Sequence, residues 1–347
     1  MRLDVFPISC LIISLMAFGL MAWTVDDALE HFYALAQPYG RNIVIFVLAL
    51  LWFQFVIAVL TKILQDVGKN ISNEEKLGWY KTYLRTYTWL NVISAVLALV
   101  VTSTSFTIYK ALIVGAEGYG LDATFIAWDR MIFGGNDGWV LTHRVFDTAT
   151  ATMWLDFLYH PTFLPMIVLY LFSITPLGLN ELRQTYMLSF LAGFVVIGMI
   201  GASAMHSAGP VFDGVLYGDG GTFGPLMDGL QIQLAEGGGP VYADPIRQYL
   251  LHMHNGQTVQ MGAGISAMPS MHMVWVFLWV FAAWNLSHIL GLIMALYAGI
   301  IWIASVHLGW HYFVDGLVSL VMIGIIWRVA GHIVGLYGRA TFIRATA

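Results

Sequence analysis

The sequence has little charge, a single cysteine and no cluster of basic residues. Only 10% of the 347 residues are charged and 59% are hydrophobic, whereas soluble domains contain about 25% charged and 45–50% apolar residues. This composition excludes most soluble folds. Cys10 has no second cysteine with which to form an internal disulfide, and no Cys or Cys/His pair has the spacing of a zinc site. The 15 Lys and Arg residues form no basic tail or patch, which excludes a nucleic-acid partner.

What the sequence has instead is a series of long uncharged runs from end to end. A bilayer core of about 30 Å requires roughly 20 apolar residues in helical form. We therefore predict an all-α integral membrane protein, a multi-span bundle of about eight transmembrane helices. The segment 139–159 is a further candidate for an interfacial or re-entrant helix. The predicted spans are residues 7–23, 42–63, 89–114, 161–177, 184–205, 271–285, 288–306 and 311–335.

The distribution of Lys and Arg predicts the orientation of these spans, because cytoplasmic loops carry more of both. Counted over alternate loops, one side holds ten of the 15 basic residues, and five of these lie in the segment 62–85. We therefore expect that segment and both termini to be cytoplasmic, and the long loops 115–160 and 206–269 to be extracytoplasmic. The many glycines of these loops indicate turns rather than a second globular domain. We expect the first span to be an anchor, because no small-residue cleavage site precedes Thr24.

Two polar segments lie at the outer mouths of predicted spans. Residues 264–272 read Gly-Ile-Ser-Ala-Met-Pro-Ser-Met-His, and residues 307–315 read His-Leu-Gly-Trp-His-Tyr-Phe-Val-Asp. His272 and His311 are 39 positions apart, which in helical form carries the chain across a membrane and back. A shared site at the outer surface is therefore geometrically possible.

The residues of these segments suit nucleophilic chemistry. His311 and Asp315 are four residues apart, which places them on one face of a helix. The carboxylate can hold one ring nitrogen and leave the other free to attack an electrophile. Ser270 follows a proline at a helix start, where backbone N–H groups hold anions, and His272 is placed to protonate a leaving oxygen. Taken singly, each residue has a structural explanation as an interfacial histidine, a helix cap or a hydrogen bond, so the prediction rests on their coincidence.

At these residues the chain resembles the type 2 phosphatidic acid phosphatase superfamily, and within it the inositol phosphorylceramide synthase-like branch with its bacterial relatives. The resemblance rests on residues 268–272 and 311–315, and more loosely on residues 207–210. It implies a six-helix catalytic core within residues 89–347. Residues 1–88 would then be an addition of two transmembrane helices and a cytoplasmic connection.

The resemblance also implies a chemistry and a place. The reaction would be independent of metals and cofactors and would pass through a phosphohistidine, at the outer face of what we expect to be a bacterial plasma membrane. His311 would be the nucleophile and Asp315 would orient it. His272 would act as general acid and then as base, and Ser270 would bind phosphate.

The chain departs from the family at three basic positions. Ala304-Ser305 stand where the third motif begins with Ser-Arg, and Ala202 and Gly209 stand where the first motif has Lys and Arg. These departures favour the synthase-like branch over a plain phosphatidate phosphatase. Other basic residues must stabilise the phosphoryl charge. By proximity in sequence we expect substrate-binding roles for His206, Arg247 and His307, ahead of Arg130, His143, Arg144, His252 and His254.

We therefore predict a membrane lipid phosphatase or phosphotransferase that takes a lipid phosphate or phosphodiester from the bilayer. The residues do not distinguish hydrolysis from transfer of a head group, such as an inositol-phosphate type, because only the last acceptor differs. A transporter or proton-coupled carrier that uses Asp315 and the histidines as a relay is an alternative. The polar residues gather at one mouth, which counts against it. A haem or metal site built on His307/His311 or His252/His254 is a weaker alternative, because no further ligand pattern accompanies either pair.

Overall fold

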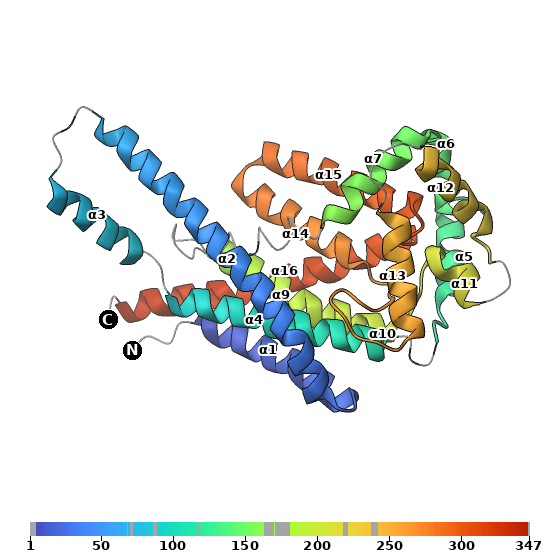
Figure 1. Ribbon diagram of the computed structural model, residues 1–347, viewed down its shortest axis with the longest axis horizontal. Helices are drawn as coiled ribbons and strands as arrows, with labels where there is room; N and C mark the ends of the chain where they lie inside the picture. Colours follow the sequence, from blue (N-terminus) through green and yellow to red (C-terminus); the bar gives the residue numbers. More distant parts are fainter. Residues whose placement is uncertain are drawn as a thin grey trace.

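The structure, a computed structural model, describes residues 5–67, 69, 72–85, 89–114, 116, 118–162, 170, 181–217, 221–236 and 242–345. Within these residues the chain forms helices and no strand. Long helices run roughly side by side, and most of the short helices gather at the end of the molecule opposite the two termini (Figure 1). The predicted all-α, multi-span membrane fold is confirmed.

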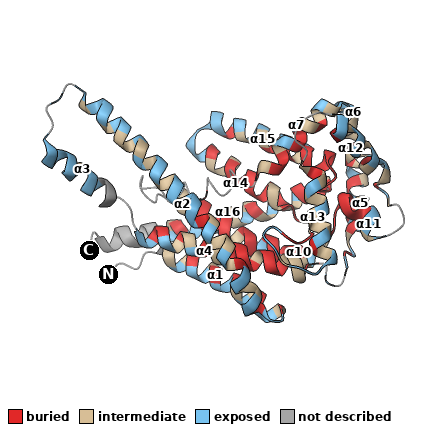
Figure 2. Ribbon diagram, in the orientation of Figure 1, coloured by how far each residue is buried: buried red, intermediate tan, exposed pale blue. Residues whose placement is uncertain are grey.

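The N-terminal helices lie at the margin of the bundle. Helix α1 packs on α4, and α2 also contacts α4. Helix α2 has 39 residues and is therefore about 58 Å long at 1.5 Å per residue, which exceeds the thickness of a bilayer core. Much of its surface is exposed, as is that of α3 (Figure 2). The bounds of these helices are Val5–Thr24 for α1, Ala28–Asp66 for α2 and Asn73–Arg85 for α3.

The remaining long helices form the core of the bundle. Helix α14 packs against α15, and α16 packs against α9 and α14. Helix α9 continues as a π-helix, η2, and ends in the short α10. The bounds are Trp89–Leu112 for α4, Glu181–Gly193 for α9, Phe194–Gly201 for η2, Ala202–Ala204 for α10, Met271–Leu286 for α14, His288–His307 for α15 and Phe313–Ala345 for α16.

Seven of the eight predicted spans correspond to apolar helices of the described chain. Six are long enough to cross a membrane, and α14 is shorter, with 16 residues. The predicted span 161–177 lies largely outside the described residues. The six long candidates are Phe6–Thr24, Ala28–Asp66, Trp89–Leu112, Glu181–Ala204, His288–His307 and Phe313–Leu336.

The two long loops contain more helix than their glycine content suggests. The segment 139–159, a candidate for one interfacial or re-entrant helix, is divided between two short helices, α6 and α7. These short helices cover the ends of α14, α15 and α16. Their bounds are Asp122–Ile132 for α5, Gly138–Val145 for α6, Ala149–Tyr159 for α7, His160–Thr162 for η1, Pro210–Phe212 for η3, Asp213–Leu216 for α11, Gly224–Glu236 for α12 and Ala243–Asn255 for α13.

Buried aspartates of α5 and α7 hold the beginnings of two other helices. Asp129 accepts hydrogen bonds from the backbone N–H groups of Phe313 and Val314, at 2.8 and 2.9 Å, where α16 begins. Asp156 accepts from the N–H groups of Tyr242 and Ala243, at 2.7 and 3.1 Å, where α13 begins. The first N–H groups of a helix have no partner within the helix. These carboxylates satisfy them, so that Asp129 attaches α5 to α16 and Asp156 attaches α7 to α13.

Candidate active site

Three segments that are distant in sequence meet at the polar end of the bundle. The N–H of Ala267 donates to the carbonyl of Ser207, and the N–H of Val211 donates to the carbonyl of Gly309, both at 2.8 Å. Gly209 has a φ of +88°, and a Cβ there would lie 2.9 Å from the carbonyl oxygen of Trp310. Only glycine fits this conformation without strain. The segments around residues 207–210, 264–272 and 307–315 therefore form one unit.

Asp122 at the start of α5 ties the first of these segments to the third. Its carboxylate accepts from Ser207 Oγ at 2.6 Å, from the N–H groups of Ala208 and Gly209, and from the Tyr312 hydroxyl at 2.9 Å. Burial and the charge of Asp122 raise the pKa of Tyr312, so the phenol stays protonated and can donate. No pattern in the sequence identified Asp122, because its partners lie more than 80 residues away.

His311 and Asp315 form a buried pair. Nδ1 of His311 lies 2.9 Å from Oδ2 of Asp315, which also accepts from the N–H of Tyr312 at 3.1 Å. His311 is 7% exposed and Asp315 is fully buried. Among the described residues no hydrogen bond occupies Nε2 of His311. With its proton on Nδ1, the ring therefore presents an unshared electron pair at Nε2. The predicted contact between the two residues is confirmed, but they do not share a helix face, because α16 begins at Phe313, two residues after His311.

His272 lies opposite this pair, in the first turn of α14. The centroids of the His272 and His311 rings are 6.4 Å apart, close enough for both rings to contact one tetrahedral group. Tyr159 of α7 stacks on His272 at 4.5 Å, with its hydroxyl 3.2 Å from Nδ1. Burial and the charge of Asp315 raise the pKa of Tyr159, so its hydroxyl remains protonated. Tyr159, which the sequence patterns did not single out, thus fixes the orientation of His272.

Ser270 caps α14, as the sequence predicted. Its Oγ accepts from the N–H of Met273 at 3.4 Å. Its carbonyl accepts from Ser319 Oγ at 3.1 Å, and the same hydroxyl is 2.7 Å from the carbonyl of Asp315. Ser319 thereby links the beginning of α14 to α16, the helix that carries Asp315. Phosphate binding by Ser270 stays a prediction.

The family model described as the PAP2 superfamily matches residues 123–329, which is more than half of the chain. This chain belongs to the PAP2 superfamily. Membership indicates a membrane enzyme of the phosphatase or phosphotransferase type. It confirms the superfamily inferred from the motifs, whereas the inositol phosphorylceramide synthase-like branch stays a prediction. No curated protein and no solved structure matches the chain.

The three basic residues expected to replace the missing charges of the PAP2 motifs have other partners. His206 Nδ1 lies 3.2 Å from the carbonyl of Ser203. Arg247 pairs with Asp244 at 2.9 Å, one turn earlier on α13. Within the described part of the chain, no hydrogen bond, ion pair or ring contact joins either residue to His272 or His311. Their role in substrate binding stays a prediction.

His307, at the end of α15, links three helices of this PAP2 protein. Its Nε2 lies 2.8 Å from Thr152 Oγ1 of α7, and its carbonyl is 3.0 Å from His143 Nε2 of α6. The His143 and His307 rings stack at 3.9 Å. Burial lowers the pKa of His143, which favours a neutral ring in this stack. These contacts account for the burial of His307 by packing, and its expected contact with substrate is untested.

A second histidine–aspartate pair lies beside the PAP2 motif residues. Nδ1 of His160, directly after α7, is 2.7 Å from Oδ1 of Asp156. Both side chains are buried, and within the described chain Nε2 of His160 has no hydrogen-bond partner. The ring contacts Tyr159 and Trp310 edge-on at 5.1 and 5.4 Å. Sequence reasoning missed this pair, although its four-residue spacing matches that of His311 and Asp315.

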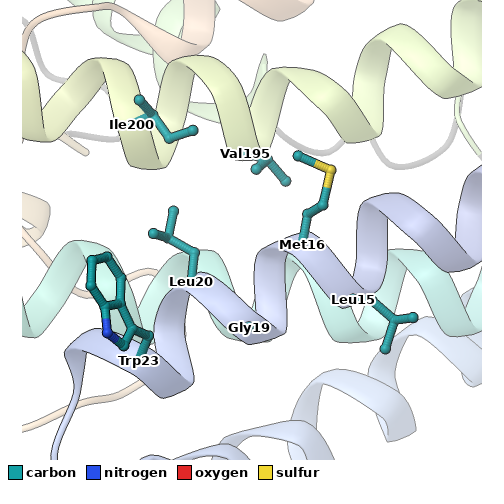
Figure 3. A pocket seen from close by; sticks show the side chains of 7 residues that line it. All are labelled: Leu15, Met16, Gly19, Leu20, Trp23, Val195 and Ile200. Atoms are coloured by element: carbon teal, nitrogen blue, oxygen red, sulfur yellow. The ribbon is translucent and has the colours of Figure 1, made fainter.

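Two further observations concern the surroundings of the PAP2 site. The described residues contain no group of three or more His, Cys, Asp or Glu side chains that could hold a metal ion. An open groove of about 440 Å³ lies between α1 and η2 (Figure 3). Its lining carries no charge and includes none of the motif residues, so it is separate from the polar site. The lining residues are Leu15, Met16, Gly19, Leu20, Trp23, Val195 and Ile200.

Proposed function

We propose that this protein is a membrane lipid phosphatase or phosphotransferase that acts on a lipid phosphate or phosphodiester through a phosphohistidine at His311. The observation that carries the proposal is the buried His311–Asp315 hydrogen bond, with the His272 ring 6.4 Å from that of His311. Covalent catalysis with acid–base assistance needs a nucleophile oriented by a carboxylate and a second group that transfers protons. The His311–Asp315 pair and His272, on opposite sides of one small space, provide these groups.

In the first half-reaction, Nε2 of His311 attacks phosphorus. An N–P bond forms while the bond between phosphorus and the lipid oxygen breaks. Protonated His272 gives its proton to that oxygen, so that diacylglycerol or another lipid alcohol leaves neutral. Asp315 keeps the Nδ1 proton of His311 in place and stabilises the positive ring that forms during attack, as orienting carboxylates do in other covalent mechanisms.

In the second half-reaction, His272 acts as a base. It removes a proton from water or from a second alcohol, whose oxygen attacks phosphorus while the N–P bond breaks. Water completes a hydrolysis, whereas an alcohol completes a transfer, including the transfer of an inositol-phosphate-type head group. Both outcomes regenerate His311 with its proton on Nδ1 and need no metal ion. Ser270, His206, Arg247 and His307 are the substrate-binding residues expected from the sequence.

The proposed site faces the extracytoplasmic side, and the lipid enters from the bilayer. The basic residues of the segment 62–85 favour a cytoplasmic position for that segment. Both termini lie at the end of the bundle away from α5, α6 and α12 (Figure 1). A substrate held at the short helices would therefore be on the opposite side of the membrane from the termini.

The test compares purified wild-type protein, His311→Ala and the matched control His288→Ala. His288 is exposed at the start of α15, the end of that helix away from His307. Each protein is incubated in EDTA with radiolabelled phosphatidic acid or phosphatidylinositol, with and without a diacylglycerol or ceramide acceptor. We expect released phosphate or a new phospholipid from wild type and His288→Ala. We also expect acid-labile label on these two proteins after rapid denaturation.

Three outcomes would contradict the proposal. Activity retained in His311→Ala would exclude the phosphohistidine, and activity abolished by EDTA would favour a metal-dependent reaction. A folded wild-type protein that neither releases phosphate nor makes a new lipid from any of these substrates would restore the transporter alternative.

A further inference from the structure

In the buried ring of His160, one nitrogen has a partner in the described part of the chain and the other has none. Nδ1 is bound to Asp156 at 2.7 Å, and Nε2 has no hydrogen-bond partner among the described residues. The residue is 6% exposed. A buried polar atom without a partner costs about 1–3 kcal/mol and calls for an explanation. A ligand that accepts a hydrogen bond from Nε2 would provide one.

The position of His160 connects it to both proposed catalytic histidines. Its ring contacts Tyr159, which stacks on His272 and approaches its Nδ1. Its ring also contacts Trp310, the residue before His311. His160 is therefore one side chain away from His272, and it also contacts the residue next to His311 in sequence.

Lys110, in the last turn of α4, is the second basic residue at this place. Phe106, one turn before Lys110 on α4, and Met271, the residue before His272, both lie against Gly198: a Cβ there would be 2.6 Å from the Phe106 ring and 3.2 Å from Met271 Sδ. The stem of Lys110 lies against Gly264, where a Cβ would come within 2.9 Å of Lys110 Cγ, and Gly264 has a φ of +96°. Glycine thus lets the segment that leads to Ser270 pass close to the lysine.

The ammonium group of Lys110 has no counter-charge in the described part of the chain. No hydrogen bond or ion pair engages its Nζ there, and its nearest ring, Phe106, is 6.0 Å away. A lysine in an apolar helix is expensive without a partner. An anionic substrate beside His272 would supply the missing partner.

We propose, building on the lipid phosphate chemistry proposed for this protein, that His160 and Lys110 together bind the phosphoryl group of the substrate. They supply the positive charge that the family motifs place at the positions held by Ala202, Gly209 and Ser305 in this chain. Doubly protonated His160 donates Nδ1–H to Asp156 and Nε2–H to a phosphoryl oxygen, while Lys110 contributes a second charge from α4. Asp156 is a positioning residue, because it holds the ring that contacts the substrate.

The variants separate charge, hydrogen bonding and packing. His160→Asn places an amide donor near the position of Nδ1, which preserves the bond to Asp156, but it removes Nε2. Lys110→Met removes the charge and keeps the length of the side chain, whereas Lys110→Arg keeps the charge. Lys76→Met, at an exposed position on α3, is the control.

The experiment measures the KM for radiolabelled phosphatidic acid, inhibition by inorganic phosphate and orthovanadate, and the thermal midpoint of each protein with and without phosphate. We expect His160→Asn and Lys110→Met each to raise KM and both inhibition constants at least about tenfold, because each loses a charge-assisted hydrogen bond. Lys110→Arg and Lys76→Met should stay within about threefold of wild type, because both keep the positive charge at position 110.

The outcomes distinguish this subsite from the proposed function. Unchanged KM and unchanged phosphate inhibition in both variants of an active enzyme would overturn the subsite alone. If the wild-type protein is inactive, phosphate should still raise its thermal midpoint, and it should not raise that of His160→Asn or Lys110→Met. If phosphate does not raise the thermal midpoint of the wild-type protein, the subsite is overturned. If His160→Asn does not fold, equal phosphate affinity of Lys110→Met and Lys110→Arg overturns it.

Discussion

The two histidine–aspartate pairs at the polar end of the bundle share a spacing and differ in what else the carboxylate does. In both pairs the residues are four positions apart, and Nδ1 of the histidine contacts a fully buried carboxylate, at 2.9 Å for Asp315 and 2.7 Å for Asp156. Asp315 lies on α16 and follows its histidine, which is just before that helix. Asp156 lies on α7 and precedes its histidine, which is just after that helix. The same local geometry thus occurs in both orders along the chain.

The two pairs differ in whether the same carboxylate also holds the beginning of a helix. Asp315 binds His311 and the N–H of Tyr312, and the beginning of α16 is held by a separate carboxylate, Asp129. Asp156 both binds His160 and accepts from the first N–H groups of α13. Changes at Asp315 should therefore affect chemistry more than folding, whereas changes at Asp156 should affect both.

Asp315→Asn should have the largest effect, a loss of at least about a thousandfold in kcat with the protein still folded. The amide can donate to Nδ1 of His311, which leaves the proton on Nε2 and removes the nucleophilic electron pair; a comparable change in a serine protease triad costs about 10⁴-fold. Steady-state kinetics on phosphatidic acid checks the rate, and circular dichroism checks the fold. A variant within tenfold of wild type would show that the first pair is structural.

His272→Gln tests the group between the two pairs. We expect a loss of about 10²–10⁴-fold in kcat, the usual contribution of a general acid. The loss should be smaller with an aryl phosphate, whose leaving group needs no proton. An equal loss for lipid and aryl substrates would contradict the role of His272 as the acid in the first half-reaction.

Asp156→Asn should give a smaller kinetic effect than Asp315→Asn and a larger effect on stability. We expect a rise in KM of about tenfold, because the ring of His160 loses its charged partner. We also expect a loss of roughly 1 kcal/mol of stability from the weakened cap of α13. Kinetics and thermal denaturation in detergent measure the two effects separately. If Asp156→Asn lowered kcat as strongly as Asp315→Asn does, the distinction between the pairs would fail.

Asp129→Asn should weaken the cap of α16 much as Asp156→Asn weakens that of α13, and its distinguishing effect, the smallest of the four, is a change in how stability depends on pH. Burial raises the pKa of Asp129 from 3.8 to about 6, against two backbone hydrogen bonds that lower it. A raised pKa favours the protonated folded form, so this contribution to stability is complete below about pH 4 and is lost as the pH rises through 6. The variant cannot ionise, and its thermal midpoint should fall less than that of wild type between pH 4.5 and 7.5. Parallel profiles would contradict this assignment.

Local spacing explains which parts of the site were predictable. The contact of His311 with Asp315 and the cap at Ser270 both join residues three or four apart, which lie within about one turn of each other at a helix start. The spans were predictable for a similar reason, because the length of an apolar run decides whether it can cross a bilayer. The short helices of the outer loops were not, because contacts between distant segments position them: Asp129 of α5 holds the beginning of α16, and Asp156 of α7 holds the beginning of α13.

The sequence by itself determined that this protein is a helical membrane protein, and it predicted that His311, Asp315, Ser270 and His272 share one site. Only the tertiary structure decided which other groups lie near them, namely Lys110 of α4, Asp122 of α5, Tyr159 of α7 and His160, the residue after α7. The four-residue spacing of Asp156 and His160 was present in the sequence without indicating a role. Contacts across 80 or more residues depend on how helices pack, and a one-dimensional pattern carries no information about that packing.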